Sequence, residues 1–309
     1  MTMLYKYVDA SYFDKIFPNE TGGTFKCSYP KDFNDPYELF LTVEFDQDPE
    51  GAAFYEEIVG KLQQLPTTCF SRSPTVIPMW AHYARNHSGI VIEFSEEKLK
   101  AAFPQGNFDN VTYRDTPLQG LKSLFDRAQY IGKPRYFHML QNGLYFAAYF
   151  TKTTAWAYEL DRRMILNDSE MRKLDGLMLM DVPAECITSI TVGARASIET
   201  KRLVEKQCNS MECDYIEMRI GRSSATPFFI NESGDTIIFD GEGFQQTNKY
   251  CQSCKEPTTT ESEKCSWCGI EESHRKDAAG RNTYRILQHH GLLERYIESM
   301  QEIDRRHGS

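Results

Sequence analysis

The sequence predicts a mixed α+β protein: a mixed sheet with flanking helices, followed by a small cysteine-rich module and a C-terminal helix. Strand-like and helix-like stretches alternate along the first two thirds of the chain, but the helical ones are not spaced as regular crossovers between parallel strands. Four of the nine cysteines then crowd into 18 positions near the C-terminus. The predicted divisions are a main domain over 1–222, a hairpin and linker over 223–250, the cysteine module over 251–270 and the terminal helix over 274–309.

The composition of the 309 residues limits the class of protein. Apolar residues make up 40% of the chain, which is enough to build a packed core and argues against wholesale disorder. No apolar run approaches the ~20 residues that a membrane-spanning helix needs, and no secretory signal is visible. We therefore expect a cytoplasmic protein. Its net charge of −9 argues against a generally basic, nucleic-acid-coating surface, but it is compatible with a local basic cleft.

The predicted strands of the main domain are short and rich in aromatic or β-branched residues. They span 3–8, 67–71, 89–94, 163–166, 187–192 and 215–220. The first contains Tyr5 and Tyr7, and the third enters a β-branched run from Gly89. Between the first two strands, Asn34 and Asp35 precede a proline. Because Asn and Asp bond their own backbone and Pro fixes φ, this is a turn signal.

The predicted helices of the main domain span 50–62, 78–84, 95–99, 116–152 and 198–207. Pro78 suits the first turn of its helix, where a missing N–H costs nothing. Ser95 is a helix cap followed by two acids. After residue 222, the runs 228–230 and 236–239 predict a hairpin. At the C-terminus an apolar stripe at helical spacing predicts packing onto the body of the protein or onto a second copy, which would make an oligomer.

The cysteine spacing predicts a metal site. Cys251 and Cys254 are separated by two residues, as are Cys265 and Cys268, and ten residues lie between the pairs. Each pair lets a tight turn aim both sulfurs at one ion, and four thiolates complete the tetrahedron of a zinc ribbon. Iron is the minor variant, and two disulfides would require a secreted protein. A site closed by four protein ligands is structural, and the polar spacer between the pairs would depend on the metal to fold.

Three clusters of polar and aromatic residues stand out in the main domain. They are Phe33-Asn34-Asp35-Pro36-Tyr37-Glu38; Cys69-Phe70-Ser71 with Met79-Trp80-Ala81-His82-Tyr83-Ala84; and Lys152 with Trp156-Ala157-Tyr158-Glu159-Leu160-Asp161-Arg162-Arg163. Together they resemble the bacterial domain-of-unknown-function family 2971, over roughly residues 3–220. The third cluster departs from the family pattern at Asp161, where the family has the longer Glu. The cysteine module and the terminal helix lie outside the shared region.

These clusters predict either an ion-pair network or a ligand pocket. In the network, Glu159 and Asp161 share one face of a strand and pair with basic neighbours. In the pocket, Lys152 and Arg163 anchor phosphates, while His82 and Glu159 carry proton or charge work. The aromatic and polar residues expected around the ligand are Tyr5, Tyr7, Asn34, Asp35, Trp80, Tyr83, Trp156 and Tyr158.

The pocket layout is similar to that of the mono-ADP-ribosyltransferases, and no Gly-x-Gly-x-x-Gly or Walker A motif offers another nucleotide site. The similarity implies an ADP-ribosyltransferase-like fold with NAD as substrate. It implies that a residue of the first strand (Lys6 or Tyr7), then Tyr83 and finally Glu159 hold NAD, and that Glu159, with His82 and Tyr83 beside it, stabilises an oxocarbenium-like transition state. Bacterial enzymes of this kind are often toxins or anti-phage effectors that modify nucleic acid or protein.

Two other function classes stay open on the sequence alone. A metal-dependent nuclease would use Glu93, Glu159 and Asp161 with a divalent ion. A non-enzymatic module would bind nucleic acid or a protein through the zinc ribbon and the terminal helix. The tail as a whole is no DNA clamp, because residues 251–309 carry nine basic and ten acidic side chains.

Overall fold

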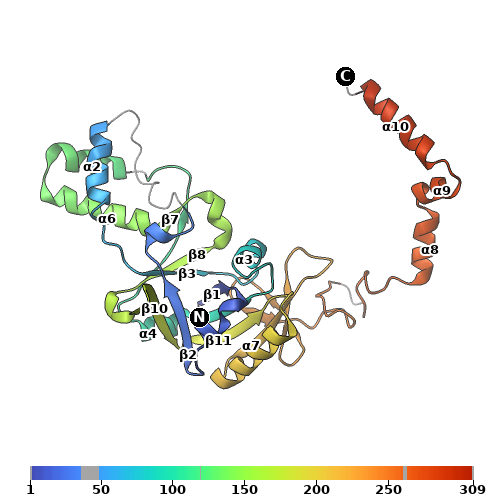
Figure 1. Ribbon diagram of the computed structural model, residues 1–309, viewed down its shortest axis with the longest axis horizontal. Coiled ribbons are helices and arrows are strands. Elements are labelled where there is room, and N and C mark those ends of the chain that lie inside the picture. Colours follow the sequence, from blue (N-terminus) through green and yellow to red (C-terminus); the bar gives the residue numbers. More distant parts are fainter. Residues whose placement is uncertain (1, 36–48, 119, 260–262, 308–309) are drawn as a thin grey trace. The chain divides into compact units, whose positions relative to one another are not determined.

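A ten-stranded sheet organises the first of two units, Met1–Gln246, and Thr247–Ser309 forms the second (Figure 1). The computed structural model describes residues 2–35, 49–118, 120–259 and 263–307. In spatial order the strands are β15 (Phe244–Gln246), β14 (Thr236–Phe239), β13 (Phe228–Asn231), β12 (Asp214–Arg219), β11 (Ile187–Val192), β4 (Ile90–Ser95), β1 (Met3–Val8), β3 (Thr67–Ser71), β8 (Asp161–Ile165) and β5 (Asn107–Asn110).

The sheet is mixed. Neighbouring strands in it run antiparallel except β11 and β12, which are parallel. Parallel neighbours need a crossover, and α7 (Ile198–Met211) supplies it, with Ser197 accepting a hydrogen bond from the Thr200 N–H as its cap. The mixed α+β class with flanking helices is therefore confirmed.

Two cores lie on opposite faces of this sheet, because alternate residues of a strand point in opposite directions. Leu4 of β1 belongs to one core, and Tyr5 and Tyr7 belong to the other. A three-stranded sheet of β2 (Gly22–Cys27), β10 (Leu177–Pro183) and β9 (Arg172–Leu174) contributes to the first core, where Phe25 packs edge-on against Phe94 with ring centroids 5.2 Å apart. The second core holds α3 (Ile77–His82) against the sheet.

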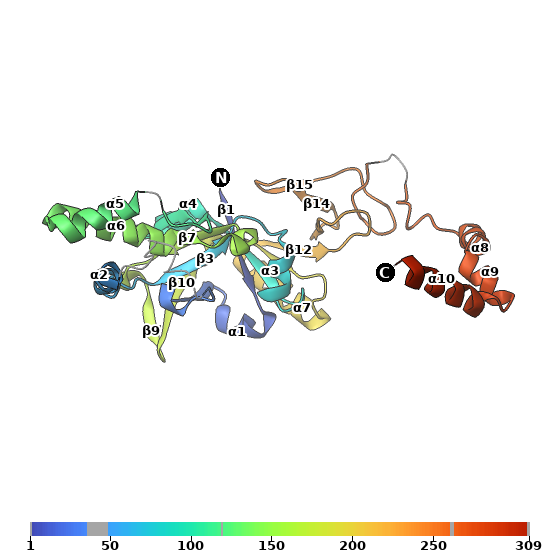
Figure 2. The ribbon, with the colours of Figure 1, turned by 90° about the horizontal axis from the view of Figure 1, so that it is seen from above.

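A helical layer forms a third core from α2 (Pro49–Val59), α5 (Leu121–Asp126) and α6 (Pro134–Phe150). In both views α2 and α6 lie side by side, at the end of the unit away from α7 (Figure 2). The single helix predicted over 116–152 is wrong. A π-helical turn, Arg127–Ile131, follows α5, and Gly132 then adopts a left-handed φ of 66° that ends the helix before Pro134 begins the next.

Shorter elements complete the first unit. They are α1 (Phe13–Ile16), α4 (Glu96–Ala102) and the parallel pair β6 (Thr112–Tyr113) and β7 (Thr151–Lys152), with 3₁₀ turns at Ala10–Tyr12, Pro30–Asp32, Thr154–Glu159, Asp168–Glu170 and Ala184–Cys186. The predicted hairpin is present as β13 and β14, but it is no linker. Because β13 pairs with β12, the hairpin and β15 extend the main sheet.

The second unit contains the four cysteines and three helices. In place of one terminal helix there are α8 (Glu272–Gly280), α9 (Thr283–His289) and α10 (Leu293–His307). Asn282 caps α9, and Gly291, at a φ of 68°, separates α9 from α10, so the chain turns twice. Among the described residues of both units, no helix has the length and apolar character needed to cross a membrane.

Candidate active site and metal centre

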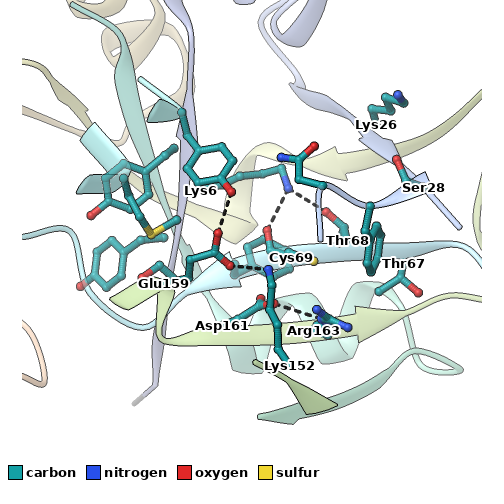
Figure 3. Close-up of a pocket in the computed structure, with 18 of the residues that line it drawn as sticks. Lys6, Lys26, Ser28, Thr67, Thr68, Cys69, Lys152, Glu159, Asp161 and Arg163 are labelled. Atoms are coloured by element: carbon teal, nitrogen blue, oxygen red, sulfur yellow. Dashed lines mark hydrogen bonds and ion pairs between the residues drawn. The ribbon is translucent and has the colours of Figure 1, made fainter. Parts of the chain in front are cut away.

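A cavity of about 300 Å³ opens beside α3, where β1, β3 and β8 are neighbours in the sheet (Figure 3). Its wall contains four basic side chains, Lys6, Lys26, Lys152 and Arg163, and three acidic ones, Asp32, Glu159 and Asp161. Most of the remaining lining is aromatic or carries a hydroxyl group. Convergent charged groups in a concave site favour a polar, charged ligand.

Glu159 is fixed through both of its carboxylate oxygens. The Tyr83 hydroxyl donates to Oε1 over 2.6 Å, and Lys152 Nζ donates to Oε2 over 2.7 Å. The Glu159 residue is only 5% exposed. Burial and the bond to Glu159 raise the pKa of Tyr83, so its hydroxyl stays a donor. Burial opposes the charge on Lys152, but Glu159 outweighs it and raises the pKa of the ammonium.

The backbone around Glu159 explains this position. Lys152 ends β7, a 3₁₀ helix spans Thr154–Glu159, and Leu160 adopts a left-handed φ of 49° before β8 begins at Asp161. The sequence predicts that Glu159 and Asp161 share one face of a strand. This prediction is wrong, because Glu159 precedes the strand. Both nevertheless line the cavity, one from the end of the 3₁₀ helix and the other from the first residue of the strand.

Asp161 forms a second buried ion pair in the same wall. Arg163 Nε lies 3.0 Å from Asp161 Oδ2, and Arg163 also donates from Nη1 to the Tyr149 carbonyl over 2.6 Å. The guanidinium stands 5.0 Å from the centroid of the Phe33 ring. Burial raises the pKa of Asp161 to about 7, although the positive charge of Lys152 opposes the shift.

Lys6, a half-buried residue of β1, contributes a third cation. Its Nζ donates to Thr68 Oγ1 over 2.8 Å and to the Cys69 carbonyl over 2.9 Å, and it stands 5.3 Å from the centroid of the Phe70 ring. Burial lowers the pKa of Lys6. The structure thus places Lys6, Lys152 and Arg163 around one cavity, with acidic partners for the last two.

Seven of the residues predicted for the pocket line this cavity. They are Tyr5, Tyr7, Asn34, Tyr83, Lys152, Glu159 and Arg163. Tyr83 and Glu159 come from sequence clusters 76 positions apart, and their direct hydrogen bond joins the second motif to the third.

Residues 79–164 match the model of the family described as Protein of unknown function (DUF2971). This match confirms the resemblance over the segment that carries the Met79–Ala84 motif and the Lys152–Arg163 motif. The DUF2971 segment contains Tyr83, Lys152 and Glu159, whereas Lys6 and Arg163's ring neighbour Phe33 come before it. No curated protein and no solved structure matches the chain.

The other predicted pocket residues do not line the cavity. Trp80 is fully buried in the second core, where its Nε1 donates to the Pro74 carbonyl. His82 is exposed, because Met79 and Tyr83, one helical turn apart, take the face of α3 toward the cavity. Half-buried Trp156 holds its ring 4.5 Å from Lys152 Nζ and so supports that ammonium from outside the cavity.

Asp35 and Tyr158 also take supporting positions. Burial lowers the pKa of Arg163 to about 9, and the charge of the buried Asp35 opposes this shift. Tyr158 is half-buried and packs on Trp156, with ring centroids 6.2 Å apart. Pro36, Tyr37 and Glu38 of the first motif lie outside the described residues.

Asp161 is predicted as part of the ion-pair network and of the nuclease alternative but not of the pocket, and Lys6 is predicted only through the resemblance. A signal for Lys6 was present. In the strand Leu4-Tyr5-Lys6-Tyr7, alternation places Lys6 on the same face as buried Leu4, so the lysine is a charged residue at an inward position. Glu93 goes elsewhere: it accepts hydrogen bonds from the Tyr5 and Thr188 hydroxyls and lines a different hollow.

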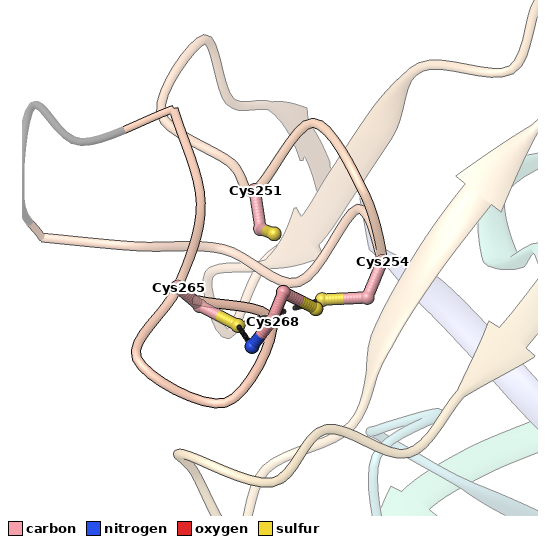
Figure 4. Close-up of side chains that lie close together, drawn as sticks. All are labelled: Cys251, Cys254, Cys265 and Cys268. Carbon is pink, nitrogen blue, oxygen red and sulfur yellow. Dashed lines mark hydrogen bonds between the residues drawn. The ribbon is translucent and has the colours of Figure 1, made fainter. Parts of the chain in front are cut away.

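The four cysteines of the second unit converge as predicted (Figure 4). Their sulfur atoms all lie within 4.8 Å of one another, and the Sγ atoms of Cys254 and Cys265 are 3.8 Å apart. Lys255, at a left-handed φ of 65°, turns the first knuckle, and its N–H donates to the Cys251 carbonyl. The Gly269 N–H closes the second knuckle on Cys265. This cluster can hold a zinc ion.

Proposed function

We propose that the cavity binds NAD and that Glu159 catalyses transfer of ADP-ribose to a nucleophile. The observation that carries this proposal is the Glu159 carboxylate. It is buried in a cavity rich in basic side chains, and Tyr83 and Lys152 hold its two oxygens in place. A carboxylate fixed in this way can meet developing positive charge without reorganising first, which is how preorganised groups lower a barrier.

The proposed reaction breaks the bond between ribose C1′ and the nicotinamide nitrogen. The electron pair of that bond leaves with nicotinamide, and the ribose carbon gains positive charge that Glu159 stabilises. A nucleophile on nucleic acid or protein then forms a bond to C1′ and gives up its proton. This chemistry needs no metal at the cavity.

A metal-dependent nuclease has less support. Glu93 does not lie in the cavity with Glu159 and Asp161, and both of those carboxylates are paired with basic side chains. Over the described ranges of the chain, the four cysteines are the only group of three or more metal-binding side chains close enough to share an ion.

For the cysteine cluster we propose a structural Zn²⁺. Zn–S bonds of about 2.3 Å in a tetrahedron place the sulfurs about 3.8 Å apart, and the Cys254–Cys265 sulfur separation has this value. Four thiolates leave no open position for a substrate, so the ion would hold the two knuckles together while the chemistry takes place in the first unit.

Incubation with NAD labelled in the adenylate phosphate, together with a cell lysate, tests the proposed transfer. We expect label to appear on nucleic acid or on protein, and nuclease and protease digestion tell which. Glu159→Gln should lose this label. Glu96→Gln is the matched control, since Glu96 is another buried carboxylate with ion pairs, to Lys100 and Arg162, but lies outside the cavity. Absence of transfer, or equal transfer by Glu159→Gln, would overturn the proposal.

A further inference from the structure

The charges around the cavity are unequally paired. Lys152 is held by Glu159, and Arg163 is held by Asp161 and by the Tyr149 carbonyl. The two residues that the sequence predicts as phosphate anchors therefore already have partners inside the protein. An incoming phosphate would have to compete with a buried carboxylate for either of them, which is unfavourable in a site of low dielectric.

Lys6 differs from both. Within the residues that the structure describes, no carboxylate lies within ion-pair distance of Lys6 Nζ, and its two hydrogen-bond acceptors, Thr68 Oγ1 and the Cys69 carbonyl, are neutral. An ammonium has three donors, so two neutral acceptors leave one donor for another group, and Asp161 acts on the charge of Lys6 only from beyond ion-pair distance. An ammonium that lines a cavity and has only neutral hydrogen-bond partners is a candidate for binding an anionic ligand.

The lining next to Lys6 suits an anion with several oxygens. Thr68 accepts from Lys6 and keeps its own hydroxyl hydrogen to donate. Ser28 adds a hydroxyl group, and the exposed Lys26 adds a second cation to the lining (Figure 3). The Thr67 hydroxyl also lines the cavity but already donates to the Leu65 carbonyl. Hydroxyl and ammonium donors together match a phosphate group, whose oxygens accept from several directions at once.

We infer that Lys6 is the phosphate-binding residue of this cavity and that the ligand is a nucleotide whose phosphates lie against Lys6 and Thr68 while its ribose lies against Glu159. The inference rests on the proposed function for the role of Glu159, but the phosphate site has a binding property of its own. Phosphate binding is thereby assigned to Lys6, which precedes the DUF2971 segment, and not to Lys152 and Arg163, which fix the two carboxylates.

Isothermal titration with ADP, pyrophosphate and adenosine tests the inference on the full chain. We expect ADP and pyrophosphate to bind and adenosine to bind much more weakly. Lys6→Met should weaken ADP binding by about 10- to 100-fold, the value of a hydrogen-bonded charge. Lys98→Met is the control, because Lys98 is an exposed lysine of the same unit outside the cavity, and it should bind ADP as the parent does.

Thermal unfolding separates a binding role of Lys6 from a structural one. Because Lys6→Met removes a half-buried charge whose hydrogen-bond partners are neutral, the variant should melt at about the temperature of the parent. ADP should raise the melting temperature of the parent and not that of the variant. A variant that melts lower yet binds ADP normally would show that Lys6 only supports the fold, and the inference would be wrong.

The outcomes also distinguish this inference from the proposed function. If ADP binds through Lys6 but NAD is never consumed, the phosphate site stands and the transferase proposal fails. If Lys6→Met consumes NAD with the KM of the parent, the transferase proposal stands and the assignment of Lys6 fails. If the parent protein binds neither ADP nor pyrophosphate, the phosphate site is disproved directly.

Discussion

Lys152 and Glu159 form a 2.7 Å ion pair in which both side chains are more than nine-tenths buried. They are seven residues apart, and the 3₁₀ helix between them brings the end of β7 and the start of β8 to the same wall of the cavity. Tyr83 of the second sequence motif binds the other oxygen of the same carboxylate. Tyr83, Lys152 and Glu159 thus form one hydrogen-bonded cluster, and removal of any of these side chains should change the positions of the other two.

Replacement of Lys152 should leave a buried charge behind. Lys152→Met is expected to cost about 3–5 kcal/mol of unfolding free energy, because Glu159 then has no cation. The double variant Lys152→Met, Glu159→Gln should recover much of that loss. Urea unfolding of the single and double variants measures this coupling.

The half-exposed pair Lys201–Glu217 provides the control for this cycle. Lys201→Met should lower the unfolding free energy by less than about 1 kcal/mol, because water screens this ion pair. Equal costs at the two pairs would contradict the account of a buried, uncompensated Glu159.

Removal of the Tyr83 hydroxyl should impair catalysis more than folding. Tyr83→Phe keeps the ring but frees Oε1 of Glu159, and we expect NAD turnover to fall roughly 10- to 100-fold with a change of about 1 kcal/mol in stability. Tyr215→Phe removes a comparable bond, to Glu217, away from the cavity. It should leave turnover unchanged, and a similar loss in both variants would indicate a general effect on the fold.

Stability should fall with rising pH because of Asp161. Its pKa is about 7 in the folded protein against 3.8 for the ordinary group. Between these values the unfolded chain releases the proton while the folded protein keeps it, so each step up in pH favours unfolding, and above pH 7 the loss is complete.

Asp161→Asn should therefore flatten the decline in unfolding free energy between about pH 4 and 7. Urea unfolding across this range measures the slope. Asp181→Asn is the control, since a bond from Arg172 lowers the pKa of Asp181 and gives the opposite sign. A slope unchanged by Asp161→Asn would refute the role of burial.

The cysteine cluster should bind one zinc ion per chain. Metal analysis of the purified protein is expected to find zinc, and Cys254→Ser should lose it because three thiolates hold the ion less tightly. Cys69→Ser, which changes a thiol outside the cluster, should keep it. Chelation should unfold the knuckles around Cys251 and Cys265, and the first unit should stay folded because its cores contain none of these cysteines. A metal-free parent protein with ordered knuckles would disprove a structural ion.

Local signals predicted the strands that carry strong β formers. The ranges 67–71 and 187–192 are strands with those bounds, and the four cysteines meet as their spacing predicts. The strand Gly22–Cys27 gave no signal, because Gly22 and Gly23 have low strand propensity. This strand forms because β10 pairs with all six of its residues, and β10 lies about 160 positions further along the chain.

The candidate site was predictable where its side chains belong to dense motifs. Lys152 and Glu159 belong to one motif and Tyr83 to another, and the three side chains meet. Trp80 belongs to the same motif as Tyr83, but its position on α3 turns it into the core, which residue types alone do not reveal. The pairing of Arg163 with Asp161, and the neutral hydrogen-bond partners of Lys6, depend on which strands become neighbours, so only the fold shows them.

Nicotinamide release from NAD, measured by chromatography in the absence of any acceptor, tests the central claim most directly. Water can take the place of the acceptor, so the parent protein should release nicotinamide and ADP-ribose. Glu159→Gln should reduce the rate by about 100-fold or more, and Glu96→Gln should match the parent. A parent protein that releases no nicotinamide, or a Glu159→Gln variant as fast as the parent, would contradict the claim that this carboxylate performs the chemistry.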